Sequence, residues 1–161
     1  MAYDSGAENL ALLKRTVAGT LDFTGRSRRT ELLYYLIATA LVSTVFGFAL
    51  MTSLPRAASV FAALALRLVL ALPLFALFAR RLHDQDRSGW WALILVVIAV
   101  LGVMQTLRII WIGNDIAAGH YHPRGPTESW IGIPLSLVYL VLAFLPGTNG
   151  PNRFGPDPRL D

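Results

Sequence analysis

Three short polar segments hold most of the residues in this chain that could do chemistry. They are residues 23–31 (FTGRSRRTE), 80–91 (RRLHDQDRSGWW) and 145–158 (LPGTNGPNRFGPDP) of a chain of 161 residues. Each segment combines arginine with a carboxylate, a pairing that forms charge-assisted hydrogen bonds, and arginine also binds anionic groups such as lipid phosphates. The candidate binding residues are Arg26, Arg28, Arg29, Glu31, Arg80, Arg81, His83, Asp84, Asp86, Arg153 and Asp157.

His83 followed by Asp84 suggests a catalytic pair. Metal-dependent phosphohydrolases use such a pair with further histidine and aspartate ligands, but His83 is the only histidine in the three segments. Ser88 could act as a nucleophile with His83 as its base, yet no oxyanion or nucleophile-elbow motif accompanies it. We therefore predict no catalytic residue and no enzyme, and keep a membrane-surface enzyme using His83 and Asp84 as the third alternative.

The other two histidines, His120 and His122, are separated by one residue. In an extended segment both rings would lie on one face and could bind a transition metal, with Asp115 and Glu128 as oxygen ligands. The pattern is more typical of a solvated loop, so we predict no metal site. No glycine-rich phosphate loop follows a strand, and the chain contains no cysteine, so no cofactor is predicted either.

Long apolar stretches must position the polar segments. The chain is 55% hydrophobic with a mean hydropathy of +0.53, and a helix needs about 20 apolar residues to cross a bilayer. We predict an all-α membrane protein in one polytopic domain, residues 1–161, because a soluble bundle would need polar helix faces. Its four transmembrane helices are expected at about residues 32–54, 57–79, 90–112 and 129–145, the last being the shortest.

The distribution of positive charge predicts the orientation. Three basic residues, Arg56, Arg108 and Arg124, fall on the opposite side of four such spans from the three polar segments. Since basic residues concentrate in cytoplasmic loops, both termini are predicted to be cytoplasmic, and the basicity reflects topology rather than nucleic-acid binding. The ten basic residues on the polar-segment side are Lys14, Arg15, Arg26, Arg28, Arg29, Arg80, Arg81, Arg87, Arg153 and Arg159.

Arg67 is the one basic residue predicted near the middle of the membrane. A charge at that depth costs about 2.5–3.5 kcal/mol on insertion scales, and no predicted span contains Asp or Glu to neutralise it. Arg67 therefore either forms an anion or lipid-headgroup site inside the bundle, which could lie on a substrate path, or extends its side chain toward the interface or hydrogen-bonds backbone carbonyls. Its candidate polar neighbours are Ser43, Gln105, Ser136 and Tyr139.

The two ends of the chain are expected to lie at the membrane surface. Residues 1–26 form an interfacial segment, in which a helix with a stripe of Leu10, Leu13, Val17 and Leu21 lies either on the inner leaflet or on the protein's own cytosolic face. Residues 146–161 are rich in proline and glycine and cannot continue a helix. This cytosolic tail is predicted to fold back so that Arg153 or Asp157 pairs with the central polar segment.

Together the three polar segments closely resemble a bacterial inner-membrane family catalogued as domain of unknown function 805. The family pattern combines F-x-G-R-x-x-R-x-E, R-L-H-D-x-x-x-S-G-W-W and L-P-G-x-x-G-x-N-R-[FY]-G-P-D-P, and it covers about residues 10–158 here. Leu32 stands where the family usually has an aromatic residue. The resemblance implies several transmembrane helices and a place in the bacterial inner (plasma) membrane, and it implies no established activity.

The leading functional hypothesis is a non-enzymatic integral membrane protein. Its arginine-rich cytosolic face would bind lipid headgroups, an anionic ligand or a partner protein, since the inner leaflet is itself anionic. The alternative is a small oligomeric transporter or channel component that uses Arg67. Membrane lipids are the expected partners, with a protein partner or a second copy of the chain as further candidates.

Overall fold

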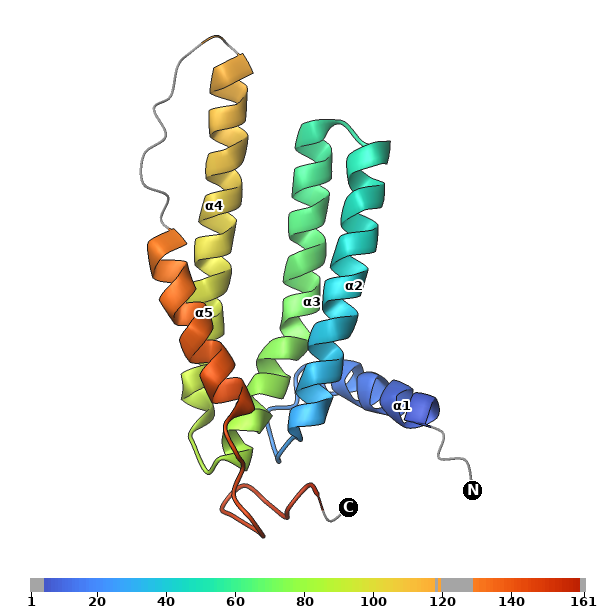
Figure 1. The fold of residues 1–161 in the computed structure, drawn as a ribbon, viewed down its shortest axis with the longest axis vertical. Coiled ribbons are helices and arrows are strands. Elements are labelled where there is room, and N and C mark those ends of the chain that lie inside the picture. The colour runs from blue at the N-terminus through green and yellow to red at the C-terminus, as the bar shows by residue number, and fades with distance from the viewer. Residues whose placement is uncertain (1–4, 118, 120–128, 160–161) are drawn as a thin grey trace.

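The computed structural model describes residues 5–117, 119 and 129–159, and the regular elements within these ranges are helices. The later helices run lengthwise, and the first lies crosswise at one end of the molecule (Figure 1), which we call the basal end. The elements are α1 (Ser5–Ala18), α2 (Arg29–Ser53), α3 (Arg56–Asp84), the short 3₁₀ helix η1 (Gly89–Ala92), α4 (Leu93–Ala117) and α5 (Ser129–Phe144). The predicted all-α fold is confirmed.

Among the residues that the structure describes, three helices are long and apolar enough to cross a membrane. They are α2, α3 and the continuous stretch Gly89–Gly113 formed by η1 and α4, which match the first three predicted spans. Helix α5 has 16 residues, which corresponds to about 24 Å at 1.5 Å per residue and falls short of a hydrocarbon layer of about 30 Å. A complete fourth crossing therefore stays a prediction.

Helices α2 and α3 form the hairpin that the short link around Pro55 predicts. Its proline fits a position just ahead of a helix, where no backbone donor is needed. Within the hairpin, the Tyr35 hydroxyl of α2 donates to the carbonyl of Leu70 in α3 at 2.8 Å. Leu70 lies close to Pro73, which has no backbone N–H to donate within the helix. Helix α3 continues to Asp84, five residues beyond the predicted end of the span at residue 79.

The buried apolar core lies toward the basal end. Phe78 of α3 and Tyr139 of α5 meet there edge to face, with ring centroids 4.7 Å apart. Farther from this end the α2–α3 hairpin and the α4–α5 pair diverge (Figure 1), and large apolar side chains such as Phe46 and Phe48 are exposed. The core comprises Leu32, Tyr35, Ala76, Leu77, Phe78, Ala79, Leu82, Ala92, Tyr139, Leu142 and Ala143.

Candidate functional site at the basal end

Asp84 at the end of α3 is the centre of a buried ionic network. Its Oδ1 accepts hydrogen bonds from Arg26 Nε at 3.0 Å and Nη2 at 2.8 Å, and its Oδ2 accepts from Arg81 Nη1. All three residues are nearly inaccessible, with Arg81 fully buried and Asp84 only 4% exposed. One carboxylate thus holds together the segment before α2 and the last turn of α3.

The same turn of α3 caps the end of α5. Arg81 donates through Nε to the carbonyl of Ala143 at 3.0 Å and through Nη2 to that of Leu145, while Gln85 Nε2 donates to Leu142 at 2.5 Å. The final carbonyls of a helix have no donor within that helix. Arg81 in the last turn of α3 and Gln85 directly after it supply those donors, and they thereby fix where α5 ends.

The tail folds over this network, as predicted. Thr148 N donates to the carbonyl of Asp84 at 2.8 Å, and Asn152 Nδ2 donates to that of His83 at 2.9 Å. Gly147 lies directly against the Asp84 carboxylate, since an added Cβ would be 1.8 Å from Oδ2. Gly150 has a φ of 75°, a conformation that favours glycine, and its carbonyl accepts from Arg26 Nη1 at 2.7 Å.

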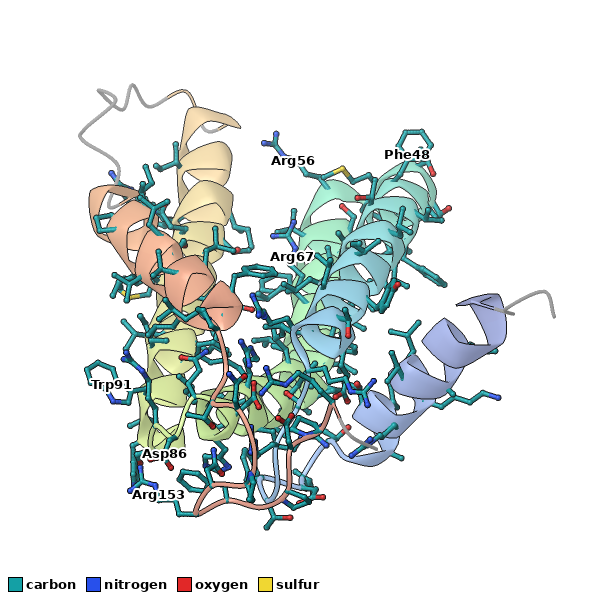
Figure 2. The ribbon with its side chains drawn as sticks, turned by 60° about the horizontal axis from the view of Figure 1, so that its bottom comes forward. Phe48, Arg56, Arg67, Asp86, Trp91 and Arg153 are labelled. Atoms are coloured by element: carbon teal, nitrogen blue, oxygen red, sulfur yellow. The ribbon has the colours of Figure 1, made fainter. Side chains whose placement is uncertain are left out.

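Of the two tail residues expected to pair with the central segment, Arg153 does so. Its Nε lies 3.1 Å from Asp86 Oδ1 in an exposed ion pair, which Figure 2 draws at the basal end. Asp157 instead binds within the tail, accepting from Arg159 Nε at 2.8 Å and from Gly150 N at 2.9 Å. These bonds, led by those from Arg159, hold the pKa of the Asp157 carboxyl well below its ordinary value.

His83 and Asp84 do not form a catalytic pair among the described residues. The Asp84 carboxylate is taken by two arginines, whereas His83 Nδ1 lies 3.2 Å from the carbonyl of Gly25. The His83 ring stacks on Phe154 at 3.9 Å between centroids, and the Ser88 hydroxyl accepts from Trp90 N. This geometry gives His83 a packing role between α3, the first polar segment and the tail.

Glu31 and the first polar segment attach α1 to the rest of the protein. Glu31 is 3% exposed, and its Oε1 accepts from the Thr16 hydroxyl of α1 at 3.0 Å. Arg28 donates through Nε to the carbonyl of Pro158, while the adjacent Arg29 is exposed. Thr16 was not singled out from the sequence, because a threonine within an amphipathic helix carries no pattern of its own.

Arg67 is exposed and lies on the side of α3 that faces α4, as does Arg56 (Figure 2). The Tyr139 hydroxyl, one of the polar neighbours expected for it, is buried without a hydrogen-bond partner among the described residues, as is the amide nitrogen of Gln105. Arg56 approaches Gly113 of α4, whose added Cβ would lie 3.6 Å from the guanidinium.

Within the described ranges, no group of three or more His, Cys, Asp or Glu side chains could hold a metal ion. The loop histidines His120 and His122, together with Glu128 and the side chain of Asp115, lie outside what the structure describes.

Arg80 lies next to the network but, unlike Arg26 and Arg81, makes no side-chain bond to Asp84 among the described contacts. It is 4% exposed, yet its Nε and Nη2 have no hydrogen-bond partner among the described residues. Its backbone carbonyl accepts from Ser27 N at 3.2 Å. The adjacent Arg81 uses all of its side-chain nitrogens on Asp84 and on the end of α5.

Comparisons with known proteins identify relatives of this chain. The family described as "Protein of unknown function (DUF805)" matches residues 20–156. Inner membrane protein YhaH of Escherichia coli (strain K12) is 30% identical over 141 residues, covering 86% of this chain and 88% of the relative. Inner membrane protein YhaI of the same strain is 31% identical over 154 residues, covering 94% of both chains. No solved structure matches the chain.

Proposed function

Because this chain belongs to the DUF805 family, whose relatives above are named as inner membrane proteins, we propose that it is a multi-pass inner-membrane protein that binds anionic lipid headgroups at its basal end. In this proposal the basal end, with both termini, lies in the cytoplasm. The ten basic residues on that side, against three on the other, support the orientation.

The observation that carries the proposal is the surface of α1. The helix lies crosswise at the base of the spans (Figure 1) and is held there from its inner side by Thr16. Its outer side exposes Leu10 and Val17, which are 52% and 58% accessible, next to the exposed Lys14. Exposed apolar side chains beside cations are typical of a helix that lies in the headgroup region of an anionic leaflet.

The charge balance at the basal end supports the same ligand. Ten basic side chains on this side of the spans face eight carboxylates, an excess of two positive charges. The side chains of Asp4, Glu8 and Asp161 lie outside what the structure describes, and each of the other five carboxylates already accepts a bond inside the protein. The donors are Thr24 to Asp22, Thr16 to Glu31, Arg26 and Arg81 to Asp84, Arg153 to Asp86, and Arg159 to Asp157.

Introduced cysteines test both parts of the proposal, since the chain has none of its own. Leu10→Cys, labelled with an environment-sensitive fluorophore in nanodiscs, is expected to be quenched by lipid-attached quenchers, and more so with phosphatidylglycerol than with phosphatidylcholine. Ser88→Cys in the exposed loop is the matched basal control and should stay unquenched. In intact cells, Ser88→Cys should resist an impermeant thiol reagent while Ser53→Cys, at the far end of α2, reacts.

Two results would contradict the proposal in different ways. Equal quenching at positions 10 and 88 would remove α1 from the membrane surface. Reaction of Ser88→Cys, but not Ser53→Cys, in intact cells would reverse the orientation.

The transporter alternative has one supporting observation. Arg67 is exposed on the face of α3 toward α4, at the depth where an unneutralised charge is costly. If Arg67 lines a path completed by a second copy of the chain, Arg67→Leu abolishes chloride efflux from proteoliposomes. Unchanged efflux from a folded variant would exclude Arg67 from such a path.

A further inference from the structure

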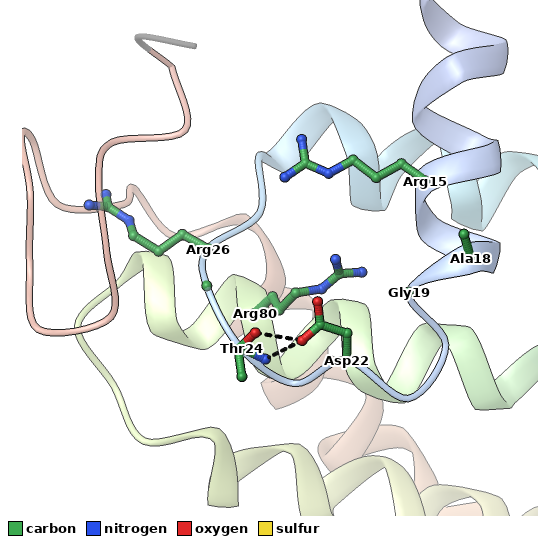
Figure 3. Close-up of a pocket in the computed structure, with 8 residues that line it drawn as sticks. Arg15, Ala18, Gly19, Asp22, Thr24, Arg26 and Arg80 are labelled. Carbon is green, nitrogen blue, oxygen red and sulfur yellow. Dashed lines mark hydrogen bonds between the residues drawn. The ribbon is translucent and has the colours of Figure 1, made fainter.

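A cavity of about 480 Å³ opens at the basal end, next to the ionic network but outside it. It lies between the end of α1, the connection from α1 to α2, and the last turns of α3 (Figure 3). Arg15 enters from α1, Asp22 from the connection, and Arg80 from α3. Volumes of this order are typical of sites for small organic ligands.

The guanidinium of Arg80 forms one wall of the cavity. It lies against Gly19, where an added Cβ would be 3.2 Å from Nη1 and 3.4 Å from Nη2. With Nε and Nη2 buried and without partners among the described residues, the side chain carries donors that neither protein nor bulk water satisfies. Burying charged donors in this way is costly unless an acceptor is supplied, and an anion in the cavity would supply one once the guanidinium turns toward it.

The charge of the cavity favours an anion, although one carboxylate lines it. The Asp22 Oδ1 already accepts from Thr24 N at 2.9 Å and from the Thr24 hydroxyl at 2.6 Å. These bonds from Thr24, led by that of the hydroxyl, lower the pKa of Asp22, so the carboxylate is charged at neutral pH. Arg15 and Arg80 against Asp22 still leave one positive charge. The third arginine at the cavity, Arg26, is committed to Asp84.

We propose that this cavity is a binding site for a phosphate group carried on a small organic molecule, with Arg80 as its main ligand and Arg15 as the second. The planar guanidinium suits two oxygens of one phosphate, and the volume leaves room for the attached group. The phosphate comes either from a lipid headgroup or from a soluble phosphate ester. This inference rests on the anionic ligand of the proposed function, but it does not require α1 to lie in the membrane.

The test uses the full-length protein in detergent and phosphate-free buffer. Calorimetry measures the binding of glycerol 3-phosphate and of short-chain phosphatidylglycerol to the wild type and to single variants. Arg15→Gln changes an exposed side chain and should weaken binding about tenfold, which is what one charged hydrogen bond contributes. Asp22→Asn should strengthen binding by a similar factor, because it removes a like charge from the site.

Arg87→Gln is the matched control, since Arg87 is an exposed arginine of the same end that does not line the cavity, and its affinity should be unchanged. Arg80→Gln should abolish binding. If the Arg80→Gln protein does not fold, Arg15→Gln and Asp22→Asn decide the outcome.

Saturable binding of glycerol 3-phosphate assigns a soluble ester, and binding of phosphatidylglycerol alone assigns a headgroup. The proposal is overturned if neither probe binds, or if Arg15→Gln and Asp22→Asn both leave the affinity unchanged. The fluorophore at position 10 reports the membrane contact of α1 separately.

Discussion

Gly147→Ala is expected to be among the most damaging single-methyl changes in this protein. The new Cβ would lie 1.8 Å from Asp84 Oδ2, 2.5 Å from Cγ and 2.9 Å from Oδ1. Gly147 does not have a positive φ, so the effect would come from the clash and not from backbone strain. Either the tail or the carboxylate must move, and the tail is anchored on both sides, by Leu145 on Arg81 and by Thr148 on Asp84.

The size of the effect follows from what Asp84 holds. Shifting the carboxylate separates it from Arg26 and Arg81, both buried, and breaking a buried ion pair costs about 3–5 kcal/mol. Because a partial shift of the tail can retain part of these bonds, we expect the free energy of unfolding to fall by roughly 2–4 kcal/mol. That is a large share of the stability of about 5–15 kcal/mol that is typical of a small domain.

The measurement is unfolding in mixed dodecyl maltoside and SDS micelles, followed by circular dichroism. Gly47→Ala is the control, since an added Cβ there meets no atom within 4 Å, and alanine is favoured in helices by about 1 kcal/mol. In a protein that already carries Asp84→Ala, Gly147→Ala should change the free energy of unfolding little, because no carboxylate then lies where the new Cβ is placed. If Gly147→Ala matches Gly47→Ala, or costs as much without Asp84 as with it, the reasoning is wrong.

Two further predictions concern the attachment of α1 and of the tail. Thr16→Val leaves the buried Glu31 without its hydroxyl donor and should cost about 1–3 kcal/mol in the same unfolding assay, whereas unchanged stability would show that α1 is held by apolar packing alone. Asp157→Asn should destabilise the protein at pH 7, because bonds from Arg159 and Gly150 depress the pKa of Asp157 in the folded state. The stabilisation from ionised Asp157 is present above the ordinary pKa of about 4 and is lost as the pH falls through the lower pKa of the folded state. The free energies of unfolding of wild type and variant should therefore converge in acid. A difference that stays constant with pH would contradict this prediction.

The helices could be predicted from the sequence because lipid imposes a simple requirement. A stretch of about 20 apolar residues with internally bonded backbone is a strong signal, and three of the four predicted spans correspond to long apolar helices. The second predicted span ends at about residue 79, because Arg80 and Arg81 end the apolar run, whereas α3 continues to Asp84. They do not end the helix, since Asp84 and the end of α5 receive Arg81 inside the protein.

The candidate site was predictable as a meeting of three segments, but not in its detail. Arg80 and Arg81 are identical in type and adjacent, yet a helix turns about 100° between neighbours. One therefore enters the ionic network and the other lines the cavity, and no sequence pattern distinguishes them. Arg15 was likewise seen only as a cation on a surface helix, because its place at the cavity depends on how the connection between α1 and α2 folds.

Arginines that pair with Asp84 and arginines that do not have different roles at the basal end of this protein. Apolar side chains gain little by leaving lipid for one another, and Ala92 is the one buried residue among the described side chains of Gly89–Gly113. The contacts that hold the spans together are therefore concentrated at the basal end, where Arg26, Arg81 and Asp84 join α3, α5 and the tail. An arginine that makes these contacts cannot also bind and release a ligand without weakening the contacts between the helices. Ligand binding must then rest on other cations, and among those that the structure describes Arg80 is buried with two side-chain nitrogens that lack a partner.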